Sequence, residues 1–191
     1  MHLLTPTSGI GRGLAETFLS RPNHTVFAGV RDLSSPTATS LKSFSAASGS
    51  SVTLVKIEST DPATATAAID TIKAAGVDHL DIVIANAGIS GAYSKVDGID
   101  IKDLREMFEV NTVGPVVLYT AAFPLLKATA DKGGRPIFVG ISTQAASQEN
   151  LKDNTPFLLG SYGASKTAMN YLVRRAHFET EWLTAFVVDP G

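Results

Sequence analysis

Tyr162 and Lys166 are two residues whose types and spacing could together perform acid–base chemistry. They lie four positions apart in a stretch with helical periodicity, so both side chains would project from one helix face. A free phenol has a pKa of about 10, too high for easy proton exchange at neutral pH. An ammonium about 4 Å away, at an effective dielectric of about 20, contributes about 4 kcal/mol, or roughly 3 pKa units. The pair therefore predicts a phenol whose pKa is lowered toward neutrality, where proton transfer is efficient.

A glycine-rich stretch near the N-terminus is a second candidate site. Residues 5–13 read Thr-Pro-Thr-Ser-Gly-Ile-Gly-Arg-Gly and join a predicted strand to a predicted helix. Glycines let the backbone approach a pyrophosphate closely, and a helix N-terminus offers free N–H groups and partial positive charge. We therefore expect a dinucleotide to bind here, although a tight turn without a ligand is the alternative. The candidate contacts are Thr5, Ser8, Gly9, Ile10 and Gly11.

The end of the second predicted strand bears on which dinucleotide would bind. NAD-specific sites usually place an acidic residue at this strand tip, but the tip here is Gly29, and Arg31 follows it. A guanidinium suits the 2′-phosphate of NADP(H), and Arg12 could also reach that phosphate. Asp32 keeps NAD(H) open as the less favoured cofactor, and Arg31 could instead be a solvated loop charge.

Apolar runs of strand length alternate with helix-period segments along the chain. The best runs are nearly all apolar, which is typical of parallel strands covered on both faces. The pattern predicts an α/β fold with a Rossmann-like doubly wound sheet in three α/β/α layers, as one domain over residues 1–191. The predicted strands are His2–Thr5, Thr25–Val30, Ser51–Ile57, Leu80–Ala85, Pro136–Ile141 and Thr184–Val188. The predicted helices are Gly11–Ser20, Ala63–Ala75 after an Asp61 N-cap, Asp103–Val110, Val113–Ala130 and Ser161–Glu179, with a weak helix and loops over Ser34–Ser51 and a surface loop at 152–156.

Composition and charge argue against several other classes. A net charge of -2, without a run of Lys or Arg, argues against nucleic acid as the main partner. The absence of cysteine excludes a disulfide scaffold and thiol catalysis, and the four scattered histidines predict no metal site. We see no signal peptide and no apolar run near the roughly 20 residues of a membrane helix, so we expect a cytoplasmic protein.

Several signatures occur in an order and placement that resemble the short-chain dehydrogenase/reductase family over essentially the whole chain. Tyr-x-x-x-Lys alone arises easily by chance, so the weight lies on the set. Its members follow predicted strands or begin the last long helix, except Asn111, which lies in the helical region after the fourth strand, and we expect them at the carboxyl edge, where open α/β sheets bind ligands. They are the glycine loop, Asn86-Ala87-Gly88, Asn111, Ser142-Thr143, Tyr162-Gly163-Ala164-Ser165-Lys166 and Asp189-Pro190-Gly191. Residues 9–14, 26–32 and 182–191 look like the fungal norsolorinic acid ketoreductase-like branch, which is similar to the small carbonyl reductases.

The resemblance implies an NADP(H)-dependent oxidoreductase that reduces a ketone or aldehyde to an alcohol. In the family pattern Tyr162 gives the proton, Lys166 also binds the nicotinamide ribose, and a hydroxyl fixes the substrate oxygen. Thr143 takes the catalytic hydroxyl position on this alignment, and Ser142 is the alternative if the register slips by one residue. Asn111 matches the family Asn that bends its helix and holds a water in a proton relay; an ordinary helix-boundary residue is the alternative.

The resemblance also implies further cofactor contacts. Asn86 would stabilise the central strand ends and approach the adenosine ribose, and Ala87 and Gly88, which follow it, belong to the same expected cofactor-binding set. Glu58 stands where the family usually has an Asp near the adenine. Pro190 and Gly191 follow the sixth predicted strand and complete the expected cofactor-binding set.

Two departures from the family pattern limit this interpretation. The glycine loop is one residue short and has Pro6 where the first glycine is expected. The chain ends at residue 191, whereas family members have about 250, so we expect the C-terminal strand and substrate lid to be lacking and the sixth strand to be an exposed edge. A catalytically weak or inactive NADP-binding protein is therefore the second hypothesis. A sugar-nucleotide epimerase would need a C-terminal substrate domain, for which there is no room.

The substrate and the assembly stay open at this level. An apolar carbonyl, aromatic or polyketide-like, is the substrate that the resemblance implies. Family members often pair through the helices at 113–130 and 161–179, so a homo-oligomer is one alternative and a monomer, as in small carbonyl reductases, is the other.

Overall fold

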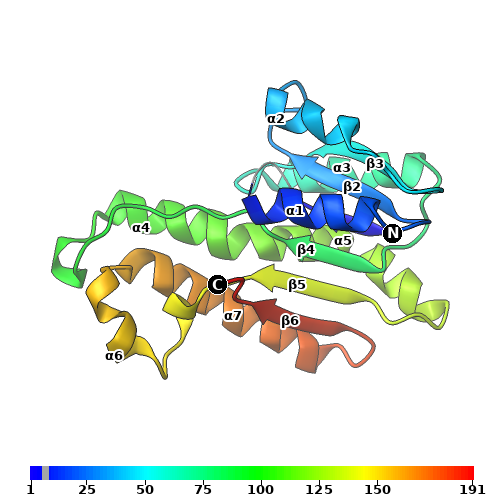
Figure 1. Cartoon of the computed structure of the whole chain (residues 1–191). Helices are drawn as coiled ribbons and strands as arrows, with labels where there is room; N and C mark the ends of the chain where they lie inside the picture. The colour runs from blue at the N-terminus through cyan, green and yellow to red at the C-terminus, as the bar shows by residue number, and fades with distance from the viewer. Residues whose placement is uncertain (6–8) are drawn as a thin grey trace.

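The computed structural model describes residues 1–5 and 9–191 and contains one six-stranded parallel sheet flanked by helices (Figure 1). The strand order is β3-β2-β1-β4-β5-β6, and every neighbouring pair is parallel. The chain order reverses between β1 and β4, which places a crevice at the carboxyl ends of these strands. The predicted doubly wound sheet is confirmed. The strands are β1 (His2–Leu4), β2 (Thr25–Val30), β3 (Ser51–Lys56), β4 (Ile82–Ala85), β5 (Ile137–Ile141) and β6 (Thr184–Val188).

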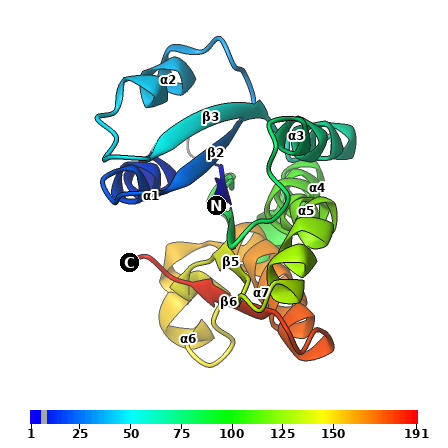
Figure 2. The same cartoon turned by 90° about the vertical axis from the view of Figure 1, so that its right-hand side faces the viewer.

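Helices cover both faces of the sheet. Figure 2 shows α1 on one side and α3, α5 and α7 on the other. Short 3₁₀ turns lie at Ser40–Ser43, Val96–Gly98, Gln144–Ala146 and Thr155–Phe157. The helices are α1 (Gly9–Leu19), α2 (Pro36–Thr39), α3 (Pro62–Ala74), α4 (Ile101–Phe108), α5 (Gly114–Asp131), α6 (Leu151–Asn154) and α7 (Gly160–Glu179).

Successive residues of a strand enter cores on opposite faces of the sheet, because side chains alternate along an extended chain. Leu3 belongs to the larger core with residues of α3, α5 and α7, whereas Leu4 packs with Ala15 and Leu19 of α1. Both leucines are fully buried. This double burial explains why the strands appear in the sequence as continuous apolar runs.

Local hydrogen bonds explain the start of α3 and correct one prediction. Asp61 accepts a hydrogen bond from Ala63 N at 3.1 Å and precedes the proline that begins α3, as predicted. The predicted surface loop at 152–156 is wrong, because this segment forms α6 and a 3₁₀ turn. Thr155 Oγ1 donates to Leu151 O at 2.9 Å, a local bond that the polar composition did not indicate.

The two helices predicted at 103–110 and 113–130 are one continuous helical segment, Ile101–Asp131, with a π-helical turn at Glu109–Val113. This segment is long and apolar enough to cross a membrane by length and composition alone, so the expectation that no segment has this character was wrong. Packing against the sheet also explains the apolar composition of this segment, since Leu118, Leu125 and Leu126 lie in the larger core.

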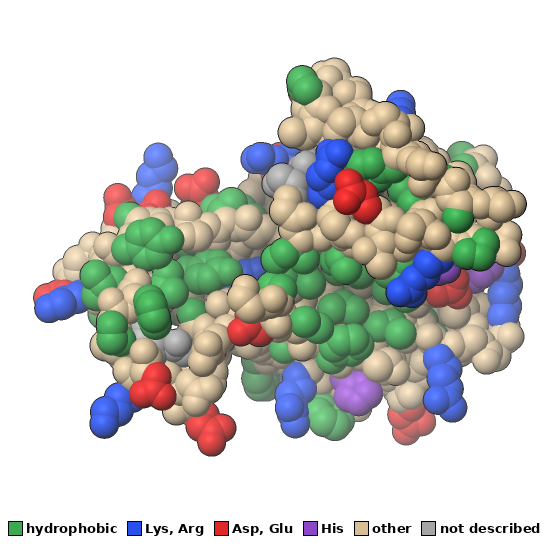
Figure 3. Space-filling view, in the orientation of Figure 1, with side chains coloured by type: hydrophobic (Ala, Val, Ile, Leu, Met, Phe, Trp, Pro, Cys, Tyr) green, Lys and Arg blue, Asp and Glu red, His purple; other side chains and the backbone are tan. Residues whose placement is uncertain are grey.

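β6 forms one edge of the sheet and, within the described residues, pairs with β5 alone. Phe186 and Val188 on this strand are 42% and 37% exposed. Figure 3 shows hydrophobic side chains gathered on the surface where β5 and β6 lie. The predicted exposed edge is therefore confirmed for this chain.

Candidate active site

A cleft of about 680 Å³ lies at the carboxyl ends of the strands, on both sides of the point where the strand order reverses. It brings together residues that are up to 186 positions apart, from Thr5 to Gly191. Most of the predicted site residues line it. These are Thr5, Ile10, Arg31, Glu58, Asn86, Ala87, Gly88, Ser142, Thr143, Tyr162, Lys166, Pro190 and Gly191.

The glycine loop is only partly described, and Ser8 and Pro6 lie outside the described residues. Gly9 begins α1 with a φ of 53°, a left-handed conformation that glycine adopts without strain. Gly11 is buried in the first turn of α1, and of the described residues in that turn Ile10 is the one that lines the cleft. The helix N-terminus is thus close to the cleft, as a phosphate site requires.

Thr5 joins β1 to β4 at the floor of the cleft. Its hydroxyl accepts from Asn86 N at 3.2 Å and from Ala87 N at 2.8 Å, and its carbonyl accepts from Asn86 Nδ2 at 2.9 Å. These bonds satisfy backbone groups beyond the end of β4 that the sheet leaves free. Thr5 and Asn86 therefore stabilise the strand ends, which agrees with the role expected of Asn86.

Gly88 is required by the closeness of two side chains. A Cβ at this position would lie 3.1 Å from both Asn111 Oδ1 and Lys166 Nζ. Gly29, at the tip of β2, has a packing reason as well, since an added Cβ would lie 2.8 Å from Ile57 Cδ1. The two glycines leave room for groups of the protein itself on either side of the cleft.

Tyr162 and Lys166 project from the first turns of α7 toward the end of β5. Lys166 is 3% exposed and its Nζ donates to Ile141 O at 2.7 Å. Burial lowers the pKa of Lys166 to about 8. The ammonium lies 6.0 Å from the centre of the Tyr162 ring, so the two side chains share one helix face as predicted.

The predicted lowering of the Tyr162 pKa by Lys166 is wrong for this geometry. Burial raises the pKa of the half-buried phenol above its ordinary value, and the nearby carboxylate of Asp189 adds to the rise. The Thr143 side chain acts in the opposite direction on this pKa but does not prevail. A lowered pKa would need an ammonium close to the phenol oxygen, whereas Lys166 is directed to the backbone carbonyl of Ile141.

The two candidate hydroxyls after β5 have different partners. Thr143 is half-buried and lines the cleft with Tyr162, and its Oγ1 accepts from Ala145 N at 3.2 Å. Ser142 donates to Asn170 Oδ1 at 2.6 Å on α7. The Ser142 hydroxyl is therefore engaged by α7, whereas the Thr143 side chain acts on the pKa of Tyr162, and Asn170 is a residue that the sequence motifs did not point to.

Asn111 lies behind the cleft in the π-helical turn and is fully buried. Its side chain accepts from Ile89 N and donates to Ile89 O, both at 2.8 Å, and donates to Ser165 Oγ at 3.0 Å. Helix distortion at this residue was predicted, and π-helical turns are frequent at functional sites. Asn111 thereby links the loop after β4 to α7 below Tyr162 and Lys166.

The three charged side chains near the end of β2 have different surroundings. Arg31 is exposed and lines the cleft. The Asp32 carboxylate accepts from Ser34 N at 2.8 Å and Ser34 Oγ at 2.6 Å, and these bonds lower the pKa of Asp32. Arg12, expected near the phosphate, donates to Ser40 Oγ at 2.7 Å and stacks over the Phe44 ring at 4.6 Å, so the structure directs it to the loop after α2.

Comparison with known proteins decides the family. The model of the family described as short chain dehydrogenase matches residues 3–191. This chain belongs to the short-chain dehydrogenase/reductase family. It is 40% identical over 185 residues to the short-chain dehydrogenase srdF of Neurospora crassa, a match that covers 96% of this chain and 71% of the relative. It is 38% identical over 194 residues to the norsolorinic acid ketoreductase nor1 of Dothistroma septosporum, covering 100% of this chain and 70% of that protein.

Solved structures agree with this placement. The chain superposes with a TM-score of 0.87 on an NADPH-bound carbonyl reductase from chicken fatty liver, at 29% identity, and covers 78% of that chain. The carbonyl reductase Sniffer of Caenorhabditis elegans gives a TM-score of 0.83 at 25% identity. The short-chain dehydrogenase described here is therefore an oxidoreductase homologous to ketoreductases and carbonyl reductases.

The cleft of this short-chain dehydrogenase fits a dinucleotide. It extends from Gly29, Arg31 and Glu58 at the ends of β2 and β3 to Tyr162 and Lys166 on α7. Gly9, with its left-handed φ, begins α1 next to Ile10, which lines the same cleft. Residues that the sequence analysis did not single out also line the cleft, and strand-end position was the signal that could have found them: Ser59, Thr60, Ile89 and Ser90.

Proposed function

We propose that this protein reduces a ketone or aldehyde to an alcohol with NADP(H). The observation that carries the proposal is that Tyr162, Thr143 and Lys166 line one cleft at the carboxyl ends of the strands, with the Lys166 ammonium 6.0 Å from the phenol ring. A phenol with a hydroxyl neighbour can hold a carbonyl oxygen and deliver a proton to it.

The chain's own residues account for substrate binding and for the proton. The substrate oxygen accepts hydrogen bonds from Tyr162 and Thr143, and Tyr162 transfers its proton to that oxygen as the alcohol forms. The bound nicotinamide supplies the hydride that completes the reduction. The raised pKa of Tyr162 keeps the phenol protonated at neutral pH, which suits a proton donor to a carbonyl. Lys166 and Asn111 hold the Ile141 and Ile89 backbones on either side of the phenol.

NADP(H) is the cofactor that the charges favour over NAD(H). Arg31 is the cation at the adenine side of the cleft and would pair with a 2′-phosphate. Asp32, the residue that could have bound ribose hydroxyls, is turned to Ser34. An apolar ketone of aromatic or polyketide-like character is the substrate class we propose, since several relatives are norsolorinic acid ketoreductases.

NADPH oxidation with a panel of aromatic and aliphatic ketones tests the proposal. We expect turnover by the wild-type chain and its loss in Tyr162→Phe, which retains the ring but lacks the proton donor. Tyr171→Phe is the matched control, because Tyr171 is an exposed phenol on the same helix. NADPH binding without turnover by the wild type would refute the proposal and favour the second function, a catalytically weak NADP-binding protein, for which the shortened glycine loop is the motive.

A further inference from the structure

Three side chains at successive turns of α7 contact the end of β5. Tyr162 lies near the Thr143 side chain in the cleft, and Lys166 donates to Ile141 O at 2.7 Å. Asn170, four residues further along the same face, accepts from the Ser142 hydroxyl at 2.6 Å. The first two contacts belong to the proposed reaction, whereas the third has no assigned role.

The hydrogen bond to Asn170 engages the Ser142 hydroxyl, which could otherwise bind the substrate oxygen in place of Thr143. Ser142 is 6% exposed, so its hydroxyl needs a partner inside the protein. Its backbone N also donates to Val188 O at 2.7 Å, which fixes the residue between α7 and β6. With both polar groups engaged, the orientation of the strand end is set.

We propose that Asn170 is a positioning residue, which holds the Ser142 hydroxyl away from the substrate and leaves Thr143 as the hydroxyl that faces Tyr162. This inference rests on the proposed function and names which of two adjacent hydroxyls serves it. Thr143 also accepts from Ala145 N, so its own position depends on the backbone that follows β5. Without the Ser142–Asn170 bond the backbone after β5 could turn, and Thr143 would then move away from the phenol.

Kinetics of three variants test the inference. Asn170→Leu removes the acceptor at similar volume, and we expect kcat about tenfold lower with the KM for NADPH within about twofold, because one hydrogen bond that positions a reacting group is lost. Asn170→Asp retains an acceptor oxygen and should recover most of kcat. In a Ser142→Ala background Asn170→Leu should have no further effect, because the partner is already absent. The control is Tyr171→Phe, next to Asn170 on the exposed side of α7.

Two kinetic results would overturn the inference: an unchanged kcat in Asn170→Leu, or a loss of the same size in the Ser142→Ala background. A merely structural role would lower stability without recovery of kcat in Asn170→Asp. If the wild type does not turn over ketones, the proposed function fails. The inference is then tested separately by crystal structures of the wild type and of Asn170→Leu. The Ser142–Asn170 hydrogen bond should be present in the wild type, and in Asn170→Leu Thr143 should move away from Tyr162; an unchanged position of Thr143 would refute positioning. Should Asn170→Leu not fold, Asn170→Ala takes its place in both measurements.

Discussion

Replacement of Gly88 by alanine should damage catalysis more than folding. The added Cβ would lie 3.1 Å from Asn111 Oδ1 and from Lys166 Nζ, closer than the 3.4–4 Å of ordinary contact. Asn111 cannot yield easily, because its amide group makes two 2.8 Å bonds to Ile89. Lys166, at the end of a flexible side chain, is therefore the group that moves, by a few tenths of an ångström.

The size of the effect follows from that displacement. Overpacking in a well-filled region costs about 1 kcal/mol of unfolding free energy at the lower end of its range. A misplacement of 1 Å in a site can cost about 100-fold in rate, so a shift of a few tenths in Lys166 should lower kcat about tenfold. NADPH oxidation and urea unfolding measure the two quantities on the same sample.

A matched glycine separates this effect from a general cost of alanine. Gly98 lies in the 3₁₀ turn before α4, and an added Cβ there would meet Ser94 Cβ at 3.9 Å, an ordinary contact. Gly98→Ala should change stability by less than about 0.5 kcal/mol and leave kcat unaltered. A Gly88→Ala enzyme with wild-type kcat would contradict the view that Lys166 needs its present position.

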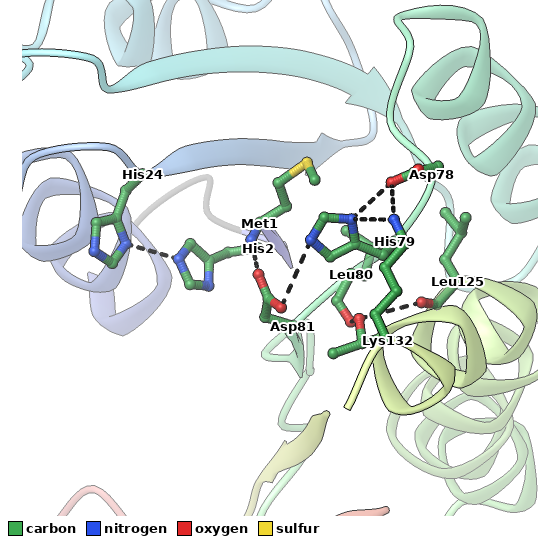
Figure 4. Close-up of polar contacts among 10 residues, drawn as sticks. Met1, His2, His24, Asp78, His79, Leu80, Asp81, Leu125 and Lys132 are labelled. Carbon is green, nitrogen blue, oxygen red and sulfur yellow. Dashed lines mark hydrogen bonds and ion pairs between the residues drawn. The ribbon is translucent and has the colours of Figure 1, made fainter. Parts of the chain in front are cut away.

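Three further predictions concern charge. The Lys166 pKa of about 8 predicts that kcat/KM falls as pH rises through 8, to about a tenth at pH 9, because the ammonium is lost; Lys166→Arg should move this limb upward, and a limb that stays near 8 would assign it to another group. His2, bonded through Nε2 to His24 Nδ1 at 2.7 Å (Figure 4), has its pKa lowered by burial from 6.5 to about 4. The unfolded chain then binds the proton more readily below pH 6.5, so urea unfolding should give about 2 kcal/mol less stability at pH 5 than at pH 7, and His2→Leu should flatten this dependence. Arg31→Asp should weaken NADPH binding at least about tenfold while NADH binding changes less, measured by fluorescence titration; tighter NADH than NADPH binding in the wild type would refute the cofactor assignment.

The strands could be predicted because burial on two faces leaves a local pattern. β2 and β6 have the predicted bounds, and the other strands differ by one or two residues at their ends. The distortion of the helix at Asn111 was expected, but the bonds of Asn111 to Ile89 and Ser165 were not predicted. The helical turn of α6 was missed, since it depends on a bond from Thr155 to Leu151 that periodicity does not encode. Long-range contacts are set by packing, which a linear pattern does not contain.

The same distinction explains the site. Which residues would lie at the carboxyl edge could be predicted from strand ends alone, and most of them line one cleft. The direction in which the Tyr162 pKa is shifted could not be predicted, because it depends on whether Lys166 faces the phenol or a backbone carbonyl. The partner of Ser142 could not either, because Asn170 lies 28 positions away on a helix whose rotation is fixed by packing.

Residues between Tyr162 and Lys166 show how that rotation is fixed. Gly163 lies against the turn after β5, where an added Cβ would be only 2.7 Å from Ala145 O, so a larger side chain would separate α7 from this turn. Ser165 donates to Tyr162 O at 2.8 Å and accepts from Asn111, which joins α7 to the π-helical turn on its other side. Gly163 and Ser165, which lie between Tyr162 and Lys166, thus have structural roles of their own. A close approach at Gly163 and a hydrogen bond at Ser165 hold α7 at the one rotation in which phenol and ammonium both reach the end of β5, and the helical repeat then places Asn170 on Ser142.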